Sequence, residues 1–94
     1  MTQTTILAAG NTLATSTDVV VTPGTFTTIG IFAAADGRLP TEAVITVYQD
    51  SPGFDNVVQT LNNERRSIVL IGPGTYRVIR QAYTGTAFGA YSET

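Results

Sequence analysis

The sequence predicts one all-β domain spanning residues 1–94, a small immunoglobulin-like or jelly-roll-like β-sandwich of seven to eight short antiparallel strands. Runs rich in valine, isoleucine, threonine and aromatic residues recur along the chain. Glycine, proline, asparagine and aspartate separate them, with turn signals about every 8–12 residues, which is typical of sandwiches and barrels. No segment requires a helix. A chain of 94 residues can bury one modest core.

A stretch that occurs twice gives the strongest support for two layers. Residues 19–29 read V-V-V-T-P-G-T-F-T-T-I, and residues 69–79 read V-L-I-G-P-G-T-Y-R-V-I, fifty residues further along. Proline presets φ and glycine tolerates φ above zero, so Pro23-Gly24 and Pro73-Gly74 each suit a type II turn. Two-residue hairpins prefer primed turns instead. We therefore expect both turns to be corners that carry the chain between sheets.

The elements of the first half follow from composition. Residues 1–17 are small and polar apart from Ile6-Leu7, and they fit either an edge strand or an extended arm ordered by a neighbour. Strong β runs follow at 18–22 and 25–34. The second of these has little polar face, so we place it near the centre of a sheet. Asp36-Gly37 and Pro40 predict the loop that follows.

The second half predicts the remaining strands. Residues 43–49 alternate between apolar and polar side chains, which indicates a half-buried strand. Residues 56–61 fit a helical face or a short strand, and their valines and the following Asn62-Asn63 favour the strand. Further strands are expected at 67–71, 75–82 and 86–91, with turns at 50–53 and 83–85.

Tyr76 opens the strand after the second corner. Immunoglobulin-like sandwiches place a tyrosine at this point, and its hydroxyl bonds backbone a few residues upstream. On that interpretation residues 67–71, 76–82 and 86–91 act as strands E, F and G. Phe26, the counterpart of Tyr76 in the first copy, lacks the hydroxyl and is expected simply to pack.

Composition argues against most chemistry. Only 13% of residues are charged, against about 25% in a typical domain. The net charge of −2 gives no basic surface for nucleic acid. Histidine, cysteine and lysine are absent, so the commonest catalytic bases and activated nucleophiles are missing, and we predict no catalytic residue, metal or cofactor. No apolar run is long enough for a membrane-spanning helix.

The remaining candidates are residues that could contact other protein. Arg77 and Arg80 lie three apart on one strand and so face opposite sides, which directs one of them toward the core, the rim or a partner. A strand-end arginine can also snorkel to solvent. The lysine that often guards edge strands is absent, so the edges are thinly defended. The candidate interface residues are Ile6, Leu7, Arg65, Arg66, Arg77, Arg80, Tyr83 and Tyr91.

Three stretches carry a resemblance to a known group. They are D-V-V-V-T-P-G-T-F-T-T-I-G-I-F at 18–32, I-V-L-I-G-P-G-T-Y-R-V-I-R at 68–80 and T-G-T-A-F-G-A-Y at 84–91. They resemble small virion proteins of tailed bacteriophages, and the chain is most similar to β-sandwich capsid decoration (cement) proteins. That resemblance implies dimers or trimers, made in the host cytoplasm, that bind the outer capsid surface and bridge major capsid subunits.

The sequence therefore favours a non-enzymatic structural virion protein, first of all a head decoration protein. Its expected partners are the major capsid protein of a phage head and further copies of itself, with no nucleic acid and no membrane. A receptor- or carbohydrate-binding module of a tail fibre is the main alternative, and it needs an exposed aromatic platform at Tyr48, Tyr83 or Tyr91. Another tail or neck virion protein is the third.

Overall fold

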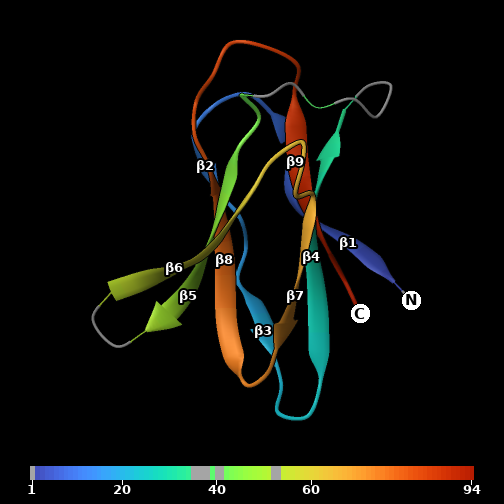
Figure 1. Ribbon diagram of the computed structural model, residues 1–94, viewed down its shortest axis with the longest axis vertical. Coiled ribbons are helices and arrows are strands. Elements are labelled where there is room, and N and C mark those ends of the chain that lie inside the picture. The colour runs from blue at the N-terminus through green and yellow to red at the C-terminus, as the bar shows by residue number, and fades with distance from the viewer. Residues whose placement is uncertain (1, 35–38, 40–41, 52–53) are drawn as a thin grey trace.

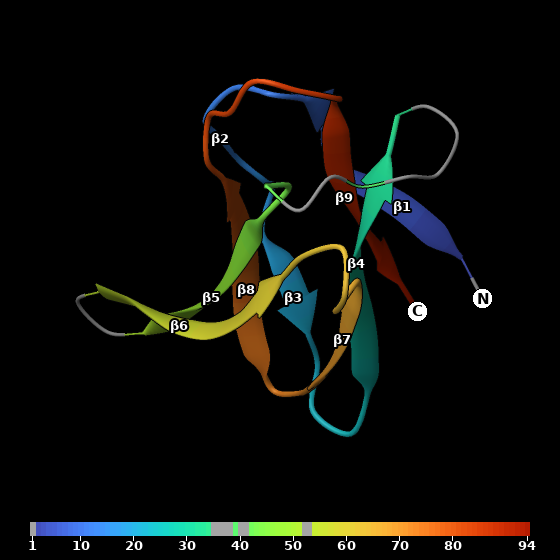
Figure 2. The same ribbon diagram turned by 45° about the horizontal axis from the view of Figure 1, so that its top comes forward.

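The computed structural model describes residues 2–34, 39, 42–51 and 54–94, and in these ranges the chain is all β (Figure 1). Two antiparallel sheets lie face to face, as both views show (Figures 1 and 2). The strands are β1 Gln3–Gly10, β2 Ala14–Thr15, β3 Val19–Val21, β4 Phe26–Ala33, β5 Ile45–Ser51, β6 Phe54–Leu61, β7 Ser67–Ile71, β8 Gly74–Arg80 and β9 Phe88–Glu93. The predicted β-sandwich is thus confirmed.

The strand order identifies the connectivity. One sheet runs β1-β9-β4-β7, and the other runs β2-β8-β5-β6 with β3 also paired to β8. Because β2 and β3 pair with successive parts of β8, they act as two halves of one interrupted strand. Counted that way, eight strands form two four-stranded sheets, and apart from the β5-β6 hairpin consecutive strands lie in opposite sheets. This is the order of a jelly roll, the second of the two arrangements expected.

The immunoglobulin-like assignment of strands E, F and G is wrong. β7 and β8 do lie in different sheets, but β9 pairs with β1 and β4 and not with β8. The segment between β8 and β9 is long enough to cross to the opposite sheet, where Phe88 and Ala90 enter the core. Residues 56–61 form part of β6, so the preference for a strand over a helix is confirmed.

Both repeated corners carry the chain between sheets, as predicted, and they lie together at one end of the sandwich (Figure 1). In the first, the Thr25 amide donates to the Thr22 carbonyl at 3.2 Å, and Gly24 has φ of 79°, as a type II turn requires. The second differs, because the Gly72-Pro73 bond is cis and Gly74 does not have positive φ. The type II expectation is therefore wrong at Pro73.

The two corners touch each other through backbone. The Gly72 amide donates to the Thr25 carbonyl at 3.0 Å, and a Cβ added to Gly72 would overlap the Thr22 carbonyl. On either side of this contact β3 pairs with β8 and β4 pairs with β7. The repeated stretch thus forms two chain reversals that pack against one another.

Tyr76 is buried, but it does not form the predicted tyrosine corner. Its ring lies over Gly74, and its hydroxyl makes no hydrogen bond with any described residue. The ring therefore contributes packing and does not hold the corner through its oxygen. Phe26, expected to pack, is 66% exposed and lies on the outer face of the β1-β9-β4-β7 sheet.

The N-terminal segment belongs to the sandwich. β1 pairs with β9, Leu7 is buried, and Ile6 packs against the core, so residues 3–10 form an edge strand of the sheet. The predicted turns at Asp36-Gly37, Pro40 and Pro52-Gly53 lie outside the described residues. The core between the sheets is built mostly from aliphatic side chains, together with Tyr76 and Phe88, and Phe88 is the largest of those less than 2% exposed.

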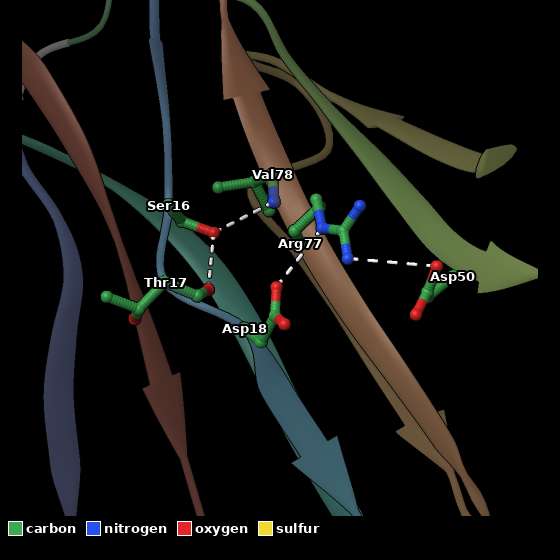
Figure 3. Close-up of polar contacts among 6 residues, drawn as sticks. All are labelled: Ser16, Thr17, Asp18, Asp50, Arg77 and Val78. Carbon is green, nitrogen blue, oxygen red and sulfur yellow. Dashed lines mark hydrogen bonds and ion pairs between the residues drawn. The ribbon is translucent and has the colours of Figure 1, made fainter. Parts of the chain in front are cut away.

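Ser16 joins the two halves of the interrupted strand (Figure 3). Its amide donates to the Val78 carbonyl at 2.8 Å, and its hydroxyl oxygen accepts from the Val78 amide at 3.0 Å. The same hydroxyl donates to the Thr17 carbonyl at 2.8 Å. A side-chain oxygen therefore takes the place of the backbone carbonyl that the ladder lacks at this break, and β8 stays paired along its length.

Replacing Ser16 by alanine should destabilise the fold by about 1–3 kcal/mol, because the buried Val78 amide loses its acceptor. Chemical denaturation followed by circular dichroism measures this free energy. Thr15→Ala is the control, because Thr15 is exposed and its side chain makes no hydrogen bond with the described residues. Equal free energies of unfolding for the two variants would show that the Ser16 hydroxyl does not repair the ladder.

Candidate functional site

Arg77 lies on the outer face of the β2-β8-β5-β6 sheet, between two carboxylates (Figure 3). Its Nε lies 3.1 Å from Asp18 Oδ1, and its terminal nitrogen lies 3.8 Å from Asp50 Oδ1. These ion pairs link β8 to β5 and to the residue that precedes β3. Tyr48 is half-buried on the same face and stands opposite Arg77 and Val57 in the strand register.

Arg80 points the other way, into the sandwich, as the odd spacing of the two arginines predicts, and it is only 4% exposed. Its guanidinium donates to the carbonyls of Thr12 at 2.8 Å, Ala8 at 2.9 Å and Phe88 at 2.7 Å. Phe88 also places its ring 5.8 Å from the guanidinium carbon. Arg80 is therefore an internal link from β8 to the opposite sheet, and it does not lie on a surface that a partner could reach.

Arg65 and Arg66 are exposed in the turn between β6 and β7. Asn62 shapes this turn, because its Oδ1 accepts from the amides of Glu64 and Arg65, both at 2.9 Å. The Arg66 carbonyl accepts from the Ile31 amide at 2.9 Å, which fixes the start of β7 against β4. Of the candidate arginines, this pair lies nearest to β7, the edge strand of the β1-β9-β4-β7 sheet.

Tyr83 packs edge-on against Phe88, with ring centroids 5.2 Å apart, so it belongs mostly to the core. Its hydroxyl is buried and has no hydrogen-bond partner among the described residues. Burial raises the pKa of the Tyr83 phenol, the Glu42 carboxylate raises it further, and the Arg80 guanidinium opposes them. Tyr83 therefore cannot supply the exposed aromatic platform of a carbohydrate-binding module.

Replacing Tyr83 by phenylalanine should leave the protein as stable at pH 7, or stabilise it slightly, because the lost hydroxyl has no bond. In the wild type, the pKa of the Tyr83 phenol is higher in the folded protein than in the unfolded chain. As pH rises, the unfolded chain therefore loses this proton first. Stability should therefore fall as pH rises above the unfolded value of about 10. Denaturation midpoints at pH 7 to 11 should fall less steeply for Tyr83→Phe. Parallel curves would contradict this.

The outer face of the β1-β9-β4-β7 sheet is the most distinctive surface, and we call it the A face. Two aromatic side chains of neighbouring strands, Tyr91 and Phe32, lie on it beside glycines. The Tyr91 ring covers Gly30, so a Cβ added there would clash with the ring. A Cβ added at Gly89 would meet the Leu7 carbonyl first and the tip of the Phe32 ring next, at 2.8 Å. We call these two rings the aromatic floor of the A face.

A shallow hollow of about 620 Å³ opens beside these rings on the A face. It is lined by Gln3, Thr5, Ile31, Phe32, Arg66, Ser67 and Tyr91. Amide, hydroxyl and guanidinium groups thus border two aromatic rings. The hollow is open to solvent, and its lining is mixed in polarity. Tyr91 and Arg66 are the two predicted candidates that the structure brings together here.

A strip of exposed apolar side chains continues the A face toward the corners. Phe26 and Ile71 stand opposite each other in the register and are 66% and 73% exposed, and Val69 is 57% exposed. Sequence reasoning missed these residues, because a run of consecutive apolar residues reads as a strand buried on both sides. Val20 and Val57, at opposite edges of the other sheet, are also exposed.

The second sheet carries the ion pairs of Arg77 with Asp18 and Asp50 on its outer face. The described residues include no group of three or more potential metal ligands. No helix capable of crossing a membrane is found in the described part of the chain. The A face offers apolar contact area, two aromatic rings and hydrogen-bonding groups.

Compared with models of known protein families, with curated proteins and with solved structures, the chain gives no significant match.

Proposed function

We propose that the chain is a non-enzymatic structural protein of a tailed-phage virion, a head decoration protein that binds the outer capsid surface and bridges major capsid subunits. The observation that carries this proposal is the exposure of large apolar side chains on both outer faces. Phe26, Val69 and Ile71 are exposed on the A face, and Val20 and Val57 on the opposite sheet. A small domain that exposes apolar side chains on two opposite faces can contact two neighbours at once.

The resemblance in turns and composition adds support, and so does the jelly roll, an architecture that viral capsid proteins use. Fold alone does not assign function, since lectins use the same architecture. Weak contacts at each face suffice for a decoration protein, because a repeated lattice supplies many copies of the same site and avidity multiplies the affinity. The low charge of the chain lowers the cost of desolvating those contacts.

The proposal predicts saturable co-sedimentation with assembled heads of the encoding phage and none with unassembled capsid subunits. Val20→Lys should weaken this binding by about tenfold or more, because it places a charge within the proposed apolar contact, while folding is unaffected at a site 67% exposed. Thr60→Lys adds the same charge at an exposed threonine of the same sheet and should bind normally. Equal binding to heads and free subunits would refute the proposal.

The hollow supports a second candidate, a carbohydrate-binding module. Sugar rings can lie on aromatic faces while their hydroxyls bond amide and guanidinium groups, and the hollow offers Tyr91, Phe32, Gln3 and Arg66. A glycan array tests this function. Retention of a glycan by the wild type and its loss in Tyr91→Ala, with Tyr48→Ala as the control on the other sheet, would favour this candidate over decoration.

A further inference from the structure

β7 is an unpaired edge of the sandwich. In the described structure it bonds β4 on one side and ends the sheet on the other. The Gly72 amide donates to the carbonyl of Thr25, just before β4, and the Arg66 carbonyl accepts from the Ile31 amide within β4. Because neighbouring residues of a strand alternate the direction of their backbone groups, the N–H and C=O of Ser67, Val69 and Ile71 point to the open side. Three donors and three acceptors are therefore available at this edge.

The edge lacks the usual protection against pairing. β7 reads S-I-V-L-I and contains no charge and no proline, and the chain has no lysine to place there. Monomeric sheet proteins normally guard such strands with charges, prolines or bulges. By contrast, the opposite edge of the same sheet is partly covered, because the Ile6 carbonyl of β1 accepts from the Thr17 amide at 3.3 Å. β7 is thus the edge best suited to accept another strand.

The two ends of this edge have complementary shapes. Next to Ile71 the A face rises, because Ile71 and Phe26 both project from it. Next to Ser67 it falls, because Ser67 is small and the hollow opens there, beside the Tyr91 ring that covers Gly30. The rise and the hollow lie on either side of Val69.

We propose that two copies of this chain form a two-fold dimer by antiparallel pairing of their β7 strands, with Val69 facing Val69 of the second copy. In this register Ser67 faces Ile71 of the second copy, and all the outward backbone groups of the three residues are paired. The two-fold axis passes between the two Val69 residues. The raised end of each copy, at Ile71 and Phe26, therefore lies beside the hollow next to Ser67 of the other copy. The occupant is a second copy because the edge complements itself in hydrogen bonds and shape, and β7 carries no charge that would oppose the pairing.

The dimer joins the two β1-β9-β4-β7 sheets into one continuous sheet of eight strands. Such an isologous contact is closed and does not grow into a fibre. The contact is smaller than a standard interface of about 1,600 Å², so we expect micromolar or weaker dissociation. The two Arg65-Arg66 pairs lie at opposite ends of the paired strands, where their charges do not oppose association.

Sedimentation velocity over a range of concentrations measures the dimer directly. The wild type should show a reversible monomer–dimer equilibrium. Val69→Lys should weaken it by more than tenfold, because two ammonium groups then face each other across the axis. Val20→Lys, which adds the same charge on the other sheet at a similarly exposed valine, should dimerise like the wild type. A wild type that stays monomeric at millimolar concentration would overturn the proposal.

Cysteine cross-linking tests the register, since the natural chain has no cysteine. Val69→Cys should form a disulfide dimer on mild oxidation, because paired Cα atoms about 5.5 Å apart fall within disulfide range. Ser67→Cys and Ile71→Cys should cross-link to each other when mixed. Neither should cross-link to itself, since like positions lie about 13 Å apart. Self-linking of Ser67→Cys, or efficient linking of a Val57→Cys control, would refute this register.

The inference deepens the proposed function and rests on it only for its biological setting, because it supplies the self-association that a decoration protein uses. The two can fail separately. Sedimentation and cross-linking require no phage head, so a dimer that ignores heads would refute decoration alone. A protein that binds heads but remains monomeric in solution and does not cross-link at Val69 would refute the dimer alone.

Discussion

Replacing Gly72 by alanine is expected to destabilise the protein by about 3 kcal/mol or more. The new methyl group would overlap the Thr22 carbonyl and lie 2.8 Å from the Val21 carbonyl, and neither backbone atom can move without separating the two corners. The backbone of Gly72 is not in the left-handed region, so the loss would come from the contact alone. Thermal unfolding should show a midpoint lower by about 12 °C or more.

Gly24→Ala is the matched control in the other copy of the repeat. A Cβ there has no atom within 4 Å, but φ of 79° is unfavourable for alanine. The expected cost is therefore only about 1–2 kcal/mol. If Gly24→Ala proved as damaging as Gly72→Ala, the contact between corners would not be the reason that glycine is needed at position 72.

Replacing Arg80 by alanine should have a comparably large effect, a loss of about 3–4 kcal/mol. The carbonyls of Thr12, Ala8 and Phe88 lose a charged donor, and the space filled by the side chain is left empty. Arg80→Lys should fall between the wild type and alanine, because one ammonium group on a flexible stem cannot reach three carbonyls that the guanidinium spans.

Arg77 provides the comparison for Arg80 on the same strand. Its side chain is 23% exposed, and its two ion pairs reach carboxylates more than half exposed, so Arg77→Ala should cost about 1 kcal/mol or less. Urea denaturation of the three variants under one set of conditions gives the ranking. Equal losses for Arg77→Ala and Arg80→Ala would show that the internal link contributes little.

The sequence predicts the architecture because its strand and turn chemistry is local. The Pro-Gly pairs, the alternation at 43–49 and the β-branched runs each specify a strand or corner without reference to the rest of the chain. Local sequence does not determine which of the two sheets β9 joins. The strand after β8 could have paired with β8, and only the packing of Phe88 and Ala90 between the sheets places it beside β1 and β4.

The surface was harder to predict than the core, for a related reason. Odd spacing correctly sends Arg77 and Arg80 to opposite faces. In contrast, V-L-I of β7 has no polar residue to mark its outer side, so Val69 and Ile71 read as core. The position of the Tyr91 ring was not predicted either, because the ring fits only where the neighbouring strand offers Gly30. Such pairs exist only once the register is known.

The contact between the two corners also has a consequence for how the molecule folds. Gly72 and Thr25 are far apart in sequence, so the intervening loop must close before their bond can form, and much of the entropy of the chain is lost before the compensating contacts appear. Topologies of this kind fold in about milliseconds to seconds. Neither half of the polypeptide should acquire structure on its own during synthesis, and folding should await release of the second Pro-Gly-Thr segment from the ribosome.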